Sequence, residues 1–110
     1  MNYIDFAAGN KDYKLRLSTR AIMTLEKQIG CNPVMIFGNG DTIPTITTMV
    51  QILHASLQPL NHGISLDDAY GIFDAWLADG HAMTDFIPVI LDIYRASGII
   101  RAEESEVKNA

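Results

Sequence analysis

The chain has almost no cysteine and no long apolar run. Its single cysteine, Cys31, excludes an internal disulfide and is typical of a reducing compartment. The first 17 residues contain no basic segment followed by an apolar one, which a secretory signal peptide would need. No stretch reaches the about 20 mostly apolar residues of a transmembrane helix. We therefore expect a cytoplasmic protein with no membrane partner.

Positive charge is scarce and lies mostly at the beginning of the chain. Residues 1–38 carry five Lys and Arg against three Asp and Glu, whereas residues 39–110 carry three against ten, which gives the net charge of −5. Nucleic acid phosphates are normally met by clustered Lys and Arg. The basic residues between Lys11 and Arg20 are too few and too diluted for this role. We expect no nucleic-acid partner, and a salt-dependent gel shift would test the rival reading of a helical DNA-binding regulator.

The familiar patterns of metal and catalytic sites are also missing. His54, His62 and His81 do not have the four-residue spacing of a helical zinc pair, and no second cysteine could complete a site. No serine lies in the strand–turn–helix elbow of a nucleophile. We expect no catalytic residues, no metal, no cofactor and no enzymatic activity.

What the sequence does contain is a strongly apolar helix over about 46–57. Apolar residues recur there at helical spacing and spread over much of the circumference. Thr45 is a suitable N-cap, because its hydroxyl can accept from a free backbone N–H of the first turn. Pro59 disfavours helical geometry at the residue before it. A helix that is apolar on most sides is buried by its neighbours, so we expect this helix, Ile46 included, at the centre of the core.

Strand and helix signals surround this central helix. Alternating residues over 3–8 and 11–17, joined by Gly9-Asn10, predict an N-terminal β-hairpin. Periodicity and capping residues predict three further helices, at about 19–29, 66–79 and 85–97. The fold class is therefore α+β, mostly α, with the hairpin packed on a bundle of about four helices plus one short helical turn.

Particular side chains are assigned to the core and to the caps. Leu66 and Tyr70 belong to the apolar stripe of the 66–79 helix, so we expect both in the core. The expected caps of the helices at 19–29, 66–79 and 85–97 are Ser18 or Thr19, Ser65 and Thr84, respectively. We expect one domain over 1–100 and a disordered acidic tail over 101–110, because that tail is polar and has no periodicity.

Two short apolar stretches are candidates for a partner-binding surface. Asn32-Pro33 begins a single helical turn that carries four consecutive apolar residues. One turn cannot direct four side chains towards one core, and contiguous exposed apolar surface tends to mark a partner. A second stretch follows the last helix. The alternative is that both stretches only close the ends of the bundle. The candidate residues are Val34, Met35, Ile36, Phe37, Ile99 and Ile100.

Three stretches together resemble one protein family. They are YKLRLSTRAIMTLEKQIGCNPVMIFG (Tyr13–Gly38), ILHASLQPLNHGIS (Ile52–Ser65) and FIPVILDIYRASGII (Phe86–Ile100). Their joint order resembles the small tail assembly chaperones of long-tailed bacteriophages and their prophage relatives, chiefly in Gram-positive hosts. The resemblance covers roughly residues 3–100. The family has an acidic residue near Thr47 or Thr48 that this chain lacks, which changes the helix cap rather than the assignment.

The resemblance implies a non-enzymatic role. Such chaperones bind the tape measure protein, keep it soluble, help to recruit tail tube subunits around it, and are absent from the mature virion. The implied partners are therefore the tape measure protein and the tail tube protein, with self-association as a further option. Many members also exist as a longer frameshifted product, which a protein sequence cannot show. The rival reading is a structural head–tail or tail component that is retained in the virion.

Overall fold

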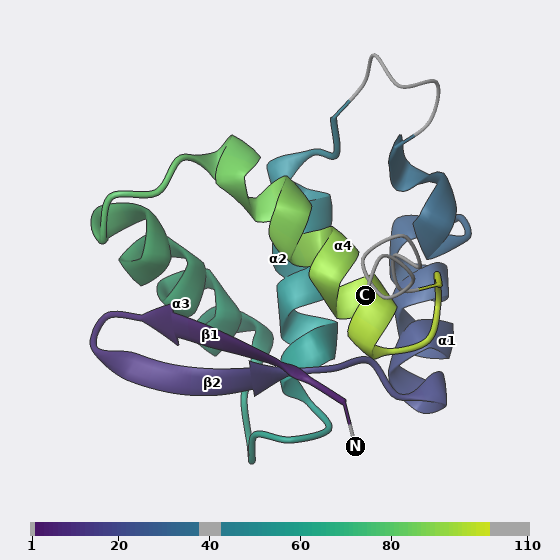
Figure 1. Ribbon diagram of the computed structural model, residues 1–110, viewed down its shortest axis with the longest axis horizontal. Helices are drawn as coiled ribbons and strands as arrows, with labels where there is room; N and C mark the ends of the chain where they lie inside the picture. The colour runs from purple at the N-terminus through teal and green to yellow at the C-terminus, as the bar shows by residue number, and fades with distance from the viewer. Residues whose placement is uncertain (1, 38–42, 102–110) are drawn as a thin grey trace, which may run out of the picture.

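A computed structural model of the chain describes residues 2–37 and 43–101 (Figure 1). Residues 38–42 and nearly all of the predicted acidic tail lie outside the described residues. The secondary-structure elements, in chain order, are β1 (Ile4–Ala8), β2 (Lys11–Leu15), α1 (Thr19–Ile29), the 3-10 helix η1 (Pro33–Phe37), α2 (Ile46–Leu57), α3 (Leu66–Ala78), the 3-10 helix η2 (Met83–Asp85) and α4 (Phe86–Ala96). This confirms the predicted fold class of a hairpin followed by four main helices.

The hairpin is held by a tight turn and by contacts from the helices. Gly9 and Asn10 have φ angles of 58° and 67°, the left-handed geometry that a two-residue turn requires. The Asp79 carboxylate, at the end of α3, accepts a hydrogen bond of 2.9 Å from the Gly9 N–H. On the outer edge of β2, the Asn61 side chain donates to the Lys14 carbonyl at 2.6 Å and accepts from its N–H at 3.4 Å. The hairpin is therefore fixed at its turn and along one edge.

Helix α2 forms the centre of the molecule, as its composition predicts. It lies between α1 and α3, and α4 crosses it on a further side (Figure 1). Because neighbours surround it, seven of its residues are buried, including Met49, Ile52 and Leu53. The remaining core centres on four aromatic rings, which form five neighbouring pairs with centroids 5.3–6.0 Å apart. These rings belong to Phe6, Phe73, Trp76 and Phe86.

The predicted caps hold at the first three main helices. The Ser18, Thr45 and Ser65 side chains each accept from a backbone N–H three residues on. Ser65 and Asp68 form a reciprocal capping box. The hydrogen bonds from the Ser65 N–H and then from its hydroxyl lower the pKa of the Asp68 carboxyl.

The start of α4 corrects one prediction. Thr84 does not cap it, because the chain first makes the η2 turn. The Asp85 carboxylate accepts from the Ala82 N–H at 2.9 Å, so this acidic side chain caps η2. Helix α4 begins at Phe86, one residue after the predicted start.

Three predicted core residues are in fact exposed. Ile46 and Tyr70 have 46% and 50% of their surface exposed, and Leu66 is exposed as well. Ile46 and Leu66 are the first residues of their helices, and Tyr70 lies one turn into α3. The predicted apolar stripe is wider than the strip that the neighbouring helices cover, so these side chains remain outside. No helix in the described part of the chain is long and apolar enough to cross a membrane.

Candidate partner-binding surface

The first candidate stretch is the short helix η1, which is fixed from both sides. Asn32 begins it as predicted: its side-chain oxygen accepts from the Val34 N–H at 3.0 Å, and its carbonyl accepts from the Met35 N–H at 2.8 Å. Pro33 is buried, and its carbonyl accepts from the Tyr94 hydroxyl at 2.9 Å. The turn therefore has a fixed orientation on the surface of the bundle.

Tyr94 anchors both candidate stretches to α4. Its hydroxyl holds η1, and its backbone carbonyl accepts from the Ile99 N–H at 2.9 Å and from the Ile100 N–H at 3.5 Å. Burial, with a smaller contribution from nearby Cys31, raises the pKa of the Tyr94 hydroxyl well above its usual range. The hydroxyl consequently stays protonated and available as a donor at any physiological pH.

The structure divides the six candidate residues into two groups. Val34 and Met35 have 40% and 63% of their surface exposed. Ile36 and Phe37 are half-buried against the core, and so are both residues of the second stretch, Ile99 and Ile100. The adjacent pair Val34–Met35 is therefore the accessible part of the predicted surface.

On α1, Met23 is an exposed apolar residue that was not predicted from the sequence. Met23 has 55% of its surface exposed on α1, away from the buried Ala21 and Leu25. A signal was present in the sequence, because Met23 lies between Arg20 and Lys27 at helical spacing.

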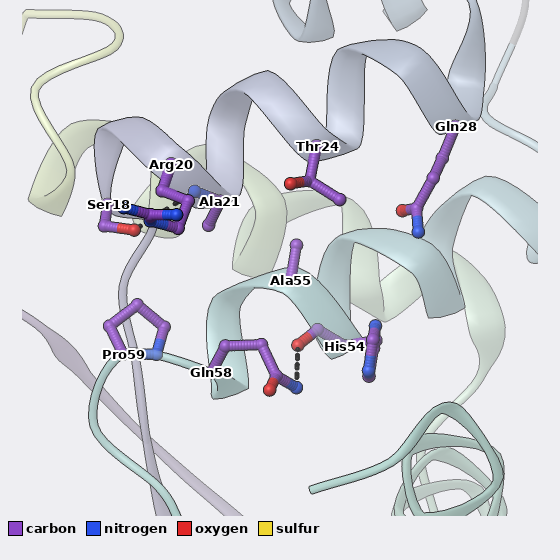
Figure 2. Close-up of a pocket in the computed structure, with 9 residues that line it drawn as sticks. All are labelled: Ser18, Arg20, Ala21, Thr24, Gln28, His54, Ala55, Gln58 and Pro59. Carbon is purple, nitrogen blue, oxygen red and sulfur yellow. Dashed lines mark hydrogen bonds between the residues drawn. The ribbon is translucent and has the colours of Figure 1, made fainter.

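Two open grooves run beside α2. One lies between α1 and the end of α2 (Figure 2). Its lining comprises Ser18, Arg20, Ala21, Thr24 and Gln28 on one side and His54, Ala55, Gln58 and Pro59 on the other. The other lies between α2 and α3. Its lining comprises Ile46, Thr47, Val50, Gln51, Tyr70, Phe73 and Asp74, so it combines two of the three unexpectedly exposed apolar residues with an acidic side chain.

The histidines are separated in the structure. His54 is half-buried on α2, His62 is exposed in the turn after it, and the His81 ring stacks on Trp76 with 4.3 Å between ring centroids. Across residues 2–37 and 43–101, no three His, Cys, Asp or Glu side chains gather in a way that could hold a metal ion.

Comparison with other proteins places the chain in a family. No curated protein and no solved structure matches it. The model of one protein family, described as a family of unknown function (DUF6096), matches residues 5–109, which is nearly the whole chain. The protein therefore belongs to the DUF6096 family.

Proposed function

We propose that the protein is a tail assembly chaperone of a long-tailed phage or prophage. In this role it binds the tape measure protein in the host cytoplasm, helps to recruit tail tube subunits around it, and is absent from the mature virion. The observation that carries the proposal is the exposed apolar pair Val34–Met35 on a turn with a fixed orientation. The tape measure protein is proposed as the client because three sequence stretches, in the same order, resemble those of the tail assembly chaperones.

The chemistry of the pair suits an apolar client helix. An amphipathic helix can bury its apolar stripe against exposed apolar side chains. The Met35 thioether is unbranched and flexible, so it can adapt to a client whose surface varies along its length. Covering about 400 Å² of such surface contributes on the order of 10 kcal/mol before the costs of association remove most of it. Several copies along one long client would therefore act together.

The anchoring of the pair supports the same role. A loose apolar loop would lose conformational freedom when it bound a client, and that loss would weaken binding. Here the Tyr94 hydroxyl and the Asn32 side chain already hold the backbone of η1. Binding then orders little more than the Val34 and Met35 side chains.

Co-expression with the tape measure protein of the same phage or prophage tests the proposal. The client should be mostly insoluble alone and soluble with this chain, and the two should co-purify. A client that stays insoluble, or that is equally soluble without the chain, would contradict the proposal.

Mass spectrometry of purified phage particles separates the chaperone from a structural tail component. A chaperone should be missing from the particles although it is abundant in the infected cell. Recovery of the chain at a fixed number of copies per particle would instead favour the structural role.

A further inference from the structure

The α1–α2 groove continues into a second depression on the outer side of α1. The groove has a volume of about 370 Å³, and Arg20 and Thr24 line both hollows. Thr19, Met23 and Lys27 complete the second depression. The two hollows therefore form one surface along α1, which we call the α1 face. Val34 and Met35 line neither hollow.

The floor of the groove is shallow and has small side chains. Ala21 of α1 and Ala55 of α2 are both buried there, and Figure 2 shows Thr24 and Gln28 pointing from α1 towards the groove. The Gln58 amide donates to the carbonyls of His54 at 2.9 Å and Ile64 at 2.8 Å, so the opposite wall is fixed. A floor of alanines lets side chains of another helix enter the groove, because neither alanine extends far from its helix.

The charge of the α1 face is opposite to that of most of the chain. Arg20 and Lys27 lie two turns apart on α1, and neither forms a salt bridge with any described residue. In the described part of the chain, none of the side chains that line the two hollows is acidic. Residues 39–110, in contrast, carry ten Asp and Glu against three Lys and Arg. The exposed Met23 adds an apolar contact between the two cations.

We propose that the α1 face binds an acidic amphipathic helix of a partner protein. The apolar stripe of that helix lies over Met23 and the alanine floor, and its flanking carboxylates reach Arg20 and Lys27. Cations spaced two turns apart along one helix match carboxylates at the same spacing on a second helix aligned with it. The charge complementarity selects an acidic helix over a basic one with the same apolar stripe. This inference does not depend on whether the partner is a tape measure protein.

A peptide titration followed by NMR tests this proposal on the full-length chain. The probe is a synthetic helix of about 18 residues, or five turns, with a Leu and Ala stripe flanked by Glu. Two control peptides keep the stripe and replace every Glu by Gln or by Lys. We expect the Glu peptide to shift the backbone amide signals of the α1 face, and the Gln peptide to bind about tenfold more weakly.

Paired variants assign the effect to the two cations. Arg20→Gln with Lys27→Gln should weaken binding of the Glu peptide about tenfold and reduce its dependence on salt. The matched control is Lys11→Gln with Lys14→Gln, which removes the same charge from the hairpin and should leave the affinity within about twofold. Equal losses from both pairs would show a nonspecific effect of net charge and would overturn the proposal.

Other results would also overturn it. They are equal binding of the Lys peptide, shifts confined to η1 or the hairpin, and no shift at about 1 mM Glu peptide. If the α1-face signals move with protein concentration alone, the occupant is a second copy of the chain. If they move when Glu103, Glu104 and Glu106 are replaced by Gln in the full-length chain, the occupant is the chain's own acidic end. Either result excludes the partner helix as the occupant.

Discussion

Helix α2 and the short helix η1 are both strongly apolar, yet α2 is largely buried and η1 is largely not. Seven residues of α2 are buried, whereas Pro33 is the one buried residue of η1. α2 contacts α1, α3, α4 and β2, whereas η1 packs mainly on α1 and is tied to α4 through Tyr94. The burial of an apolar element therefore depends on how many neighbouring elements it has. An apolar residue on a single turn with few neighbours remains available to a partner.

The largest expected contrast is between Leu53→Ala in α2 and Met35→Ala in η1. Leu53 is fully buried, so its truncation leaves a cavity and should lower the free energy of unfolding by about 2–5 kcal/mol. Met35 is mostly exposed, and its truncation should change the same quantity by no more than about 0.5 kcal/mol. Urea unfolding followed by circular dichroism measures both. A loss at Met35 as large as that at Leu53 would show that η1 belongs to the core.

Tyr94→Phe should have a smaller effect that is concentrated at η1. The substitution leaves the buried Pro33 carbonyl without its donor, which should lower the free energy of unfolding by about 1–2 kcal/mol. Hydrogen exchange of the Met35 amide should accelerate, because η1 loses its tie to α4.

Tyr70→Phe is the matched control. It removes the same hydroxyl from an exposed ring that makes no hydrogen bond within the described residues, so stability should hardly change. Equal effects of the two substitutions would contradict the anchoring role of Tyr94.

The stability that Tyr94 contributes should depend on pH in one direction. Burial raises the pKa of the hydroxyl in the folded state above the ordinary value of 10.0. The unfolded chain therefore ionises first, so this contribution is complete below pH about 10 and is lost as the pH rises further. Chemical unfolding should be measured for wild type and Tyr94→Phe between pH 8 and 11. The difference between their free energies of unfolding should shrink as the pH approaches 11. A constant difference across that range would refute a raised pKa.

The caps of α2 and η1 should give the smallest contrast in stability. Thr45→Ala removes the cap of a helix in the core and should lower the free energy of unfolding by about 1 kcal/mol. Asn32→Ala should cost less globally, since η1 can open without unfolding α2, but it should speed hydrogen exchange at Val34. If Asn32→Ala proves the costlier of the two in urea unfolding, the proposed ranking is wrong.

Local signals explain how much of the fold could be predicted. The turn at Gly9-Asn10 and the caps Ser18, Thr45 and Ser65 depend on residues close in sequence, and the structure confirms all four. The exposure of Ile46 and Tyr70 could not be predicted in the same way, because it depends on where neighbouring helices end.

The candidate surface was predictable only in part for the same reason. The sequence shows that four apolar residues on one turn are too many for one core. It does not show which of them face outward, because that is decided by the bond between Tyr94 and Pro33, which are 61 positions apart. The groove of the α1 face could likewise not be predicted, because residues of both α1 and α2 form it.

The most direct test of client binding by the Val34–Met35 pair is the amount of soluble tape measure protein co-expressed with Met35→Asp. Met35→Asp puts a charge into the proposed contact, and Leu66→Asp puts the same charge on an exposed apolar residue of α3. Both variants should first match the wild-type circular dichroism spectrum and melting temperature. If the Val34–Met35 pair binds the client, Met35→Asp should lower the soluble client to about the level seen without the chain, while Leu66→Asp should keep it near wild type. A folded Met35→Asp variant that keeps the client as soluble as wild type does would show that this pair is not the binding surface.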